Sequence, residues 1–420
     1  MDKRTFLRKL SFLSLAAIPT ARGLSNWIDL HQEIPSGELA SDEEFWHGIR
    51  MGYRLKPDYI NLENGFYCIQ PQRTLENFIK HVRYVNYQGS YYMRTVQRDN
   101  KKKMAAKLAK LAGCSPEELI VTRNTTESLD LVIGGLDWEE GDEAIMAEQD
   151  YGAMVNHFKL VGRRYGVVNK ILSVPNNPGS DEEIVKMYED AITDKTKLLM
   201  ICHMINITGH ILPVRKICDM AHKRGVKVMV DGAHAFGHIT FSMQDLNCDY
   251  YGASLHKWLS VPLGSGILYV SKENIPSLWP LLASGNNNPD DIYRLNHIGT
   301  HPVHTDLTIS DAIDYYLMIG PERKEKRLRY LQRYWSDQVR GLPNIIMNTP
   351  EEPHRSCGIA NVGVKGINPK DLAEILFEKY NIYTVGIDGQ NVHGCRITPN
   401  VFTTPAELDV LVAALKELAS

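Results

Sequence analysis

The stretch KVMVDGAH at positions 227–234 decides how the rest of the chain is organised. Its apolar run ends on a carboxylate, Asp231, and a turn of small residues with a histidine follows. Further along, GASLHK at positions 252–257 ends on a lysine, Lys257. Pyridoxal phosphate chemistry needs a lysine that forms a Schiff base and an acid that keeps the pyridine nitrogen protonated. The two stretches together therefore predict a pyridoxal phosphate site.

The composition gives no indication of a nucleic-acid or membrane-surface protein, and the small, mostly buried ligands of a metabolic enzyme fit it better. With 420 residues, 43% of them hydrophobic, the chain can bury a large core and divide into two domains. The net charge is −3 and both signs are mixed along the chain, so no basic surface for DNA, RNA or anionic lipid is expected. The 7 cysteines are scattered without a Cys-x-x-Cys pair, which predicts neither a zinc site nor a disulfide framework.

The first 25 residues differ from the rest. A basic cluster at 3–9 precedes the apolar run 10–18, which is the form of a signal peptide and too short for a spanning helix. The cluster resembles a twin-arginine export signal with lysine in place of the first arginine. It predicts export of the folded protein to the periplasm. The alternative is a frayed amphipathic N-terminus on a cytoplasmic protein, and no other segment is long and apolar enough to span a membrane.

Strands and helices alternate through the middle of the chain. Helices are expected to begin at Thr125 and at Pro213, the second with Pro in its first turn and Gly225 just past its end. The expected strands are 119–122, 144–147, 197–202 and 226–230. This alternation predicts an α/β domain with a mostly parallel sheet between helices, whose ligands bind at the carboxyl ends of the strands.

The pattern changes after about residue 310. A long charged helix at 321–342 is followed by helices that begin after Asn368 and Thr404, with strands between them. This predicts a smaller α+β unit. The expected organisation is an export signal at 1–25, an N-terminal arm packing on the body at 26–60, a large cofactor-binding domain at 61–305 and a small C-terminal domain at 306–420.

Several residues at expected strand ends suit the other parts of the cofactor. Thr125 and Thr126 offer hydroxyls and a helix N-terminus for a phosphate. Tyr151 can stack on a ring, while Asn206 and His234 can donate to the phenolic oxygen O3′. Each of these residue types is common at such positions for structural reasons, so the prediction depends on their combination with Asp231 and Lys257.

The order of motifs resembles the class V aminotransferase family of pyridoxal-phosphate enzymes, and most of all its isopenicillin N epimerase-like branch. The motifs are Thr-Thr-Glu at 125–127, Asn206-x-x-Gly209-x-x-x-Pro213, Asp-Gly-Ala-His-Ala at 231–235, Ser-x-His-Lys at 254–257, Gly299-Thr300 and Cys395-Arg396-Ile397. The resemblance covers roughly residues 60 to 415. It implies the fold type I architecture and a homodimer with active sites at the subunit interface.

The resemblance also implies a role for each matching residue. Lys257 would carry the Schiff base, Asp231 would hold the ring nitrogen and Arg396 would bind the substrate α-carboxylate. Tyr151 falls where many relatives carry a stacking aromatic or histidine. The implied cofactor contacts are Thr125, Thr126, Ser254 and His256 at the phosphate, His234 and Asn206 near O3′, and Thr300 from the neighbouring subunit.

The cofactor residues do not decide the reaction. Cysteine desulfurases of this class carry a nucleophilic cysteine shortly before the arginine, whereas 384–393 contains none and Cys395 is expected to be buried. This argues against a desulfurase. Transamination, epimerisation and, as the alternative, C–S lyase chemistry by β-elimination all pass through one Cα carbanion and stay open. Tyr91, Tyr92 and Arg94 are candidate substrate-side groups.

Two alternative hypotheses, for other classes of protein, are based on the same residues. Asp231, His234 and His238 have a spacing that could bind zinc in a metal-dependent hydrolase, but Gly232 and Gly237 oppose the helix that such a site needs. The chain could also be a cofactor-binding module without catalysis. A module of that kind has little need for Lys257, Asp231 and Arg396 together.

Overall fold

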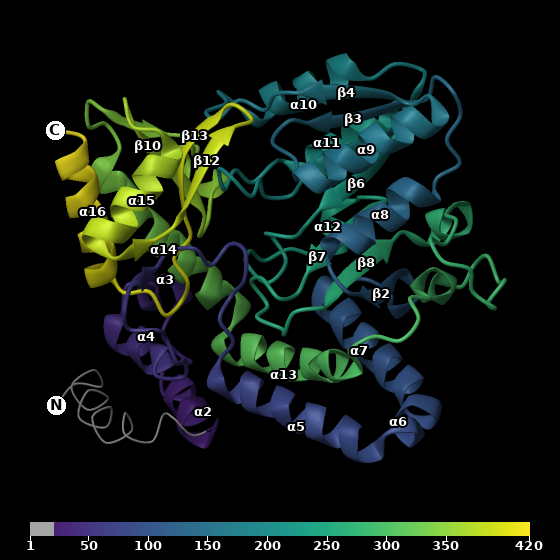
Figure 1. Ribbon diagram of the computed structural model, residues 1–420, viewed down its shortest axis with the longest axis horizontal. Helices are drawn as coiled ribbons and strands as arrows, with labels where there is room; N and C mark the ends of the chain where they lie inside the picture. The colour runs from purple at the N-terminus through teal and green to yellow at the C-terminus, as the bar shows by residue number, and fades with distance from the viewer. Residues whose placement is uncertain (1–20) are drawn as a thin grey trace.

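The computed structural model describes residues 21–420, which form two units with a helical arm across them (Figure 1). The predicted export signal lies almost wholly outside the described residues, so export stays a prediction. Within residues 21–420, no helix has the length and apolarity needed to cross a membrane.

The larger unit is built on a 7-stranded sheet with the strand order β2-β8-β7-β6-β5-β3-β4. The neighbouring strands β7, β6, β5, β3 and β4 pair in parallel, and β8 is antiparallel to both β7 and β2. This confirms the predicted α/β class with a mostly parallel sheet. The strands are β2 (Leu119–Thr122), β3 (Glu143–Ala147), β4 (Val168–Leu172), β5 (Thr196–Cys202), β6 (Lys227–Asp231), β7 (Tyr250–Ser254) and β8 (Gly266–Val270).

Helices cover both faces of this sheet. In β5, Leu198 and Met200 belong to one buried cluster while Leu199 and Ile201 belong to the other. Such a strand reads as a continuous apolar run because both faces are buried. One face is covered by α8 (Thr125–Gly135) and α9 (Gly152–Tyr165), and the other by α7 (Gln97–Ala112), α10 (Asp181–Ala191), α11 (Val214–Lys223) and α13 (Val303–Ile319).

The smaller unit is an antiparallel sheet backed by helices. Its strand order is β12-β13-β10-β9, and a short parallel pair, β1 with β11, lies beside it. The side chains of Asn368 and Thr404 cap two of its helices, as the sequence predicts. Its elements are β9 (Ile345–Met347), β10 (Ala360–Val364), β11 (Ile382–Tyr383), β12 (Val385–Gly389), β13 (Val392–Ile397), α14 (Pro321–Val339), α15 (Pro369–Tyr380) and α16 (Pro405–Leu418), and β1 (Ile60–Asn61) joins it from the arm.

The arm connects the two units rather than covering only one. Trp27 and Trp46 are buried in a cluster that includes Trp258 of the larger unit and Phe402 next to α16. The predicted domain boundary at residue 305 falls inside α13, whose apolar residues pack in the core of the larger unit. The remaining helices are α2 (Ala21–Asp29), α3 (Ser36–Leu39), α4 (Glu43–Arg50), α5 (Gln72–Gln88), α6 (Ser90–Thr95) and α12 (Met243–Leu246).

Candidate active site

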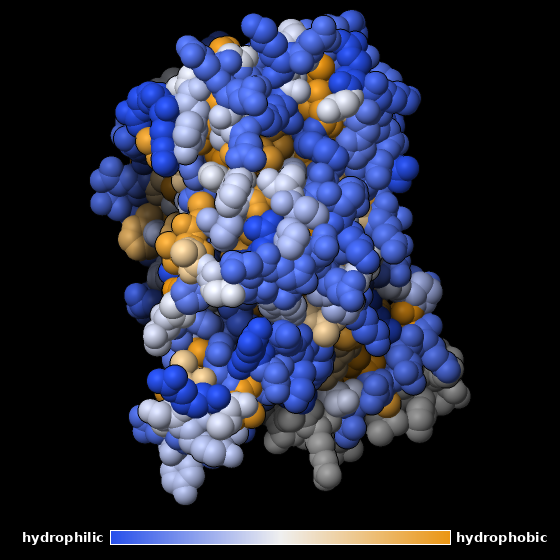
Figure 2. All heavy atoms as spheres, turned by 90° about the vertical axis from the view of Figure 1, so that its right-hand side faces the viewer, coloured by the Kyte–Doolittle hydropathy of each residue, from blue (hydrophilic) through white to orange (hydrophobic). Residues whose placement is uncertain are grey.

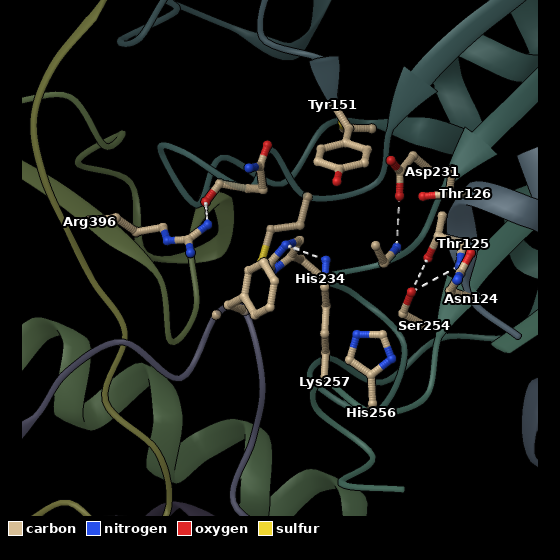
Figure 3. A pocket seen from close by; sticks show the side chains of 16 residues that line it. Asn124, Thr125, Thr126, Tyr151, Asp231, His234, Ser254, His256, Lys257 and Arg396 are labelled. Carbon is tan, nitrogen blue, oxygen red and sulfur yellow. Dashed lines mark hydrogen bonds between the residues drawn. The ribbon is translucent and has the colours of Figure 1, made fainter. Parts of the chain in front are cut away.

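A cavity of about 230 Å³ lies at the carboxyl ends of the sheet strands, where the smaller unit meets the larger one (Figure 3). Most of its wall comes from strand ends of the larger unit, with Gly65, Phe66 and Arg396 on the other side. The predicted site residues that line it are Thr125, Thr126, Tyr151, Asn206, Asp231, His234, Ser254, His256, Lys257 and Arg396. The chain therefore brings together residues that lie far apart in its sequence.

Asp231 is the last residue of β6 and lies at the floor of the cavity. Its carboxylate accepts a hydrogen bond from the Ala233 N–H at 2.9 Å, and the residue is 5% exposed. Burial raises the pKa of Asp231, while Lys257 and the Ala233 amide act in the opposite direction. A buried carboxylate of this kind is stabilised by a cationic N–H partner, and a protonated pyridine nitrogen is one.

Lys257 follows β7 and points into the same cavity. Its Nζ lies 2.9 Å from Nε2 of His234. Because the indole N–H of Trp258 donates to Nδ1 of His234 at 3.5 Å, the proton of the neutral imidazole is on Nε2, facing the lysine. Burial lowers the pKa of His234 well below its ordinary value and lowers the pKa of Lys257 to about 8. Burial therefore raises the fraction of Lys257 that is present as the neutral, nucleophilic amine.

The opposite end of the cavity offers dipoles and hydroxyls. α8 begins there, capped by the Asn124 side chain, and the Ser254 hydroxyl bonds both the Thr125 N–H (2.9 Å) and the Thr125 hydroxyl (2.7 Å). Nδ1 of His256 is buried without a hydrogen-bond partner among the described residues, and burial lowers the pKa of this histidine to about 4. A helix N-terminus with hydroxyls and a partnerless imidazole nitrogen suits a phosphate group.

Arg396 reaches the cavity from β13, and its guanidinium already has a carboxylate partner. The partner is Glu63, in the turn after β1, which sequence reasoning missed. Nη1 of Arg396 donates to the Asn206 carbonyl at 3.2 Å. Opposite these groups the Tyr151 ring, which is 47% exposed, faces the cavity from the start of α9 (Figure 3).

These groups fit the predicted pyridoxal phosphate. Asp231 suits the ring nitrogen, Lys257 suits the aldehyde carbon, and the α8 end with Ser254 suits the phosphate. All of these groups line one cavity. Nδ1 of His256 is a further polar atom there without a hydrogen-bond partner among the described residues.

Four residues singled out in the sequence do not line the cavity of this chain. Thr300 is exposed on a loop, and Tyr91, Tyr92 and Arg94 lie on α6. Tyr92 is 1% exposed and its ring packs edge-on against Tyr84, so its role in one chain is structural. The substrate-side prediction for the α6 residues therefore has no support within a single chain.

The contacts of His238 contradict the hypothesis of a metal site. Nδ1 of His238 donates to the His234 carbonyl at 2.8 Å and Nε2 accepts from the Gly358 N–H at 2.8 Å, so both nitrogens are used. The ring also stacks on Trp258 with centroids 3.7 Å apart. Among residues 21–420, no group of three or more potential ligands could hold a metal ion. The turn at Gly232 directs His234 and His238 to different surroundings.

Cys202 and Cys395 lie in or near the site, and both are buried. Cys395 is fully buried, as predicted, and burial raises its pKa to about 12. Cys202, at the end of β5, does line the cavity, but burial and the nearby carboxylates of Asp150 and Asp231 raise its pKa well above the ordinary value. Both side chains are therefore neutral thiols and poor nucleophiles.

The family Aminotransferase class-V matches residues 70–399, which is most of the chain. The chain belongs to this family. It is 28% identical over 328 residues to the isopenicillin N epimerase of Streptomyces clavuligerus, covering 74% of this chain and 82% of that one. A probable cysteine desulfurase of Halalkalibacterium halodurans is 26% identical over 303 residues, covering 69% of this chain and 73% of its own.

Solved structures show the same fold. The apo cysteine desulfurase of Thermococcus onnurineus NA1 superposes with a TM-score of 0.78 at 21% identity, covering 88% of this chain and 97% of that chain. The cystine C–S lyase C-DES in complex with cysteine persulfide gives 0.75 at 21% identity, covering 85% and 97%. These likenesses establish the fold type I architecture predicted from the sequence.

Proposed function

We propose that this member of the class V aminotransferase family uses pyridoxal phosphate to act at the Cα of an amino acid or an amino-acid-derived amine. The observation that carries the proposal is the meeting of the Lys257 amine and the Asp231 carboxylate in one cavity with the α8 N-terminus. Bound pyridoxal phosphate supplies an electron sink that acidifies the C–H bond at Cα.

The chain's own residues supply positioning and proton transfer. Asp231 keeps the ring nitrogen protonated, and His234 holds the Lys257 side chain over the cavity. The Lys257 amine would be the group that removes and returns the proton at Cα. Its pKa of about 8 suits both roles near neutral pH. Asn206 and Arg396 line the same cavity and contact each other there.

Isomerisation or transamination at Cα is favoured over sulfur transfer. Sulfur transfer through a thiol needs an accessible thiolate, whereas the one cysteine among the described residues that line the cavity, Cys202, has a strongly raised pKa. Elimination by a C–S lyase needs no such thiol and stays the second candidate, supported by the desulfurase relatives.

The test uses purified holoenzyme in deuterated water with a panel of amino acids and amines. A visible absorption band that borohydride removes, and that a Lys257→Ala variant lacks, supports the proposal. Exchange at Cα with the amino group retained identifies an epimerase, keto-acid formation identifies an aminotransferase, and pyruvate with ammonia identifies a lyase. A colourless protein that does not take up pyridoxal phosphate refutes the proposal.

We also propose a homodimer in which Thr300 of the neighbouring chain completes the phosphate end of the site. Support comes from apolar side chains on the surface, which gather in patches on an otherwise hydrophilic face (Figure 2). Leu263 and Trp279 are among the exposed apolar side chains, at 60% and 63%. The mass of the holoenzyme in solution tests this.

A further inference from the structure

Arg396, the side chain expected to bind a substrate carboxylate, is paired with an internal carboxylate. Its Nε donates to Oε2 of Glu63 at 3.2 Å and its Nη2 donates to Oε1. The two side chains are 8% and 7% exposed. Arg396 lines the cavity and Glu63 does not, so the carboxylate lies behind the guanidinium, on the side away from the substrate.

The pair is held in place from several directions. Asn61 accepts the Glu63 N–H at 3.1 Å, and the Phe66 N–H donates to Oε1 of Glu63 at 3.0 Å. A side chain on Gly65 would begin 3.0 Å from Cζ of Arg396, so the turn presses against the guanidinium. Breaking the pair would leave a buried carboxylate with a single backbone donor, which is costly. These contacts oppose separation of the pair when a substrate enters.

A paired guanidinium attracts anions less than a free one. The charge of Glu63 offsets part of the charge of Arg396 for a group that enters the cavity, and both charges are largely shielded from solvent. A free carboxylate would give up its hydration for contact with an ion pair of zero net charge. An uncharged carbonyl oxygen loses far less on entry and can still accept the remaining N–H groups of Nη1 and Nη2.

On the basis of the function proposed above, we propose that Glu63 is a specificity-determining residue that disfavours a free α-carboxylate at Arg396. The preferred substrates are then primary amines whose Cα bears an uncharged carbonyl group, such as an amino-acid amide. Glu63 acts by setting the net charge of this end of the cavity, and Arg396 supplies the hydrogen bonds.

The test compares two ligands that differ only in this group, L-alanine and L-alaninamide. Wild-type holoenzyme, Glu63→Gln and Glu63→Asp are titrated at one pH, and dissociation constants are taken from the change in the visible absorption band and expressed per neutral amine. Wild-type protein should bind alaninamide at least as tightly as alanine. In Glu63→Gln, alanine should bind at least about tenfold more tightly and alaninamide should change less than about threefold, because only the carboxylate senses the lost charge.

Glu63→Asp is the matched control because it keeps the charge, and its preference should follow that of the wild type. If Glu63 merely orients Arg396, Glu63→Gln will bind alanine equally or more weakly, or both ligands will change together, and the inference is overturned. If Glu63→Gln does not fold, the comparison of the two ligands in the wild-type protein is the test. Wild-type protein that binds alanine tenfold more tightly than alaninamide also overturns the inference. Loss of the borohydride-sensitive band in wild-type protein would instead refute the proposed function.

Discussion

The pKa of Lys257 makes cofactor loading strongly dependent on pH in a predictable way. Only the neutral amine attacks an aldehyde, so the rate of loading follows the deprotonated fraction of Lys257. Burial lowers this pKa from 10.5 to about 8, with Asp231 acting in the opposite direction and Arg396 in the same one. The rate should therefore rise with pH, reach half its maximum at about pH 8, and level off without rising further towards 10.5.

The size of the effect follows from the two pKa values. At pH 7 a lysine of pKa 10.5 is about 0.03% neutral and one of pKa about 8 is about 9% neutral, which is roughly a 300-fold difference in reactive amine. This difference in the fraction of reactive amine disappears at pH values where both amines are neutral. The comparison between pH 7 and pH 10 is therefore the most informative one.

The assay mixes cofactor-free protein with excess pyridoxal phosphate and follows the visible band in buffers from pH 6 to pH 10. Nα-acetyl-lysine under the same conditions provides the reference for an ordinary amine, and Lys257→Ala provides the blank. In Asp231→Asn, the loss of the negative charge should lower the pKa of Lys257 further and move the midpoint to lower pH. A wild-type midpoint at or above 10 would refute the reasoning, as would an unchanged or higher midpoint in Asp231→Asn.

Two further predictions concern stability, measured by chemical denaturation of the cofactor-free protein. Gly209 has a φ of +77° and a Cβ there would lie 2.0 Å from the carbonyl oxygen of Ile359, so Gly209→Ala should cost about 3 kcal/mol or more. Gly225 has a φ of +75° with no heavy atom near, so Gly225→Ala is the matched control and should cost only about 1 kcal/mol. Lys324 is buried against the Trp258 carbonyl and burial lowers its pKa to about 8, so its charge is unfavourable in the folded state below pH 8. Lys324→Met should stabilise the protein at pH 7 by about 2 kcal/mol, and this gain should shrink as the pH rises from 8 to 10.5; no gain at pH 7 would contradict the argument.

The parts of the fold that the sequence predicts are those fixed by local pattern. The run of residues in β5 is apolar because the sheet is covered on both faces, and the side chains of Asn368 and Thr404 cap helices where their spacing indicates. Asp231 could be predicted for a similar reason, since a carboxylate at the end of an apolar strand must face a ligand or a cation. In each case the deciding neighbours lie within a few residues in the chain.

The parts that the sequence did not predict depend on contacts between distant residues. Glu63 and Arg396 are separated by 333 positions, and nothing in the turn around Glu63 indicates its partner. The boundary near residue 305 fails to mark a break in the structure because α13 continues through it and packs on the larger unit. His238 was a candidate ligand on spacing alone, and only the position of Gly358 shows that its second nitrogen is used.

The other parts of the cavity also have few free positive charges among the described residues. Lys257 and Arg396 are the cations among the described residues that line it; the first is shifted towards its neutral form and the second is paired with Glu63. The phosphate end has hydroxyls, a helix N-terminus and a neutral imidazole in place of a lysine or arginine. Anions are therefore held here by oriented dipoles more than by net charge. Dipoles act only at contact distance and in a fixed direction, so such a cavity discriminates by the position of hydrogen-bond acceptors, and a substrate gains little from carrying an extra negative charge.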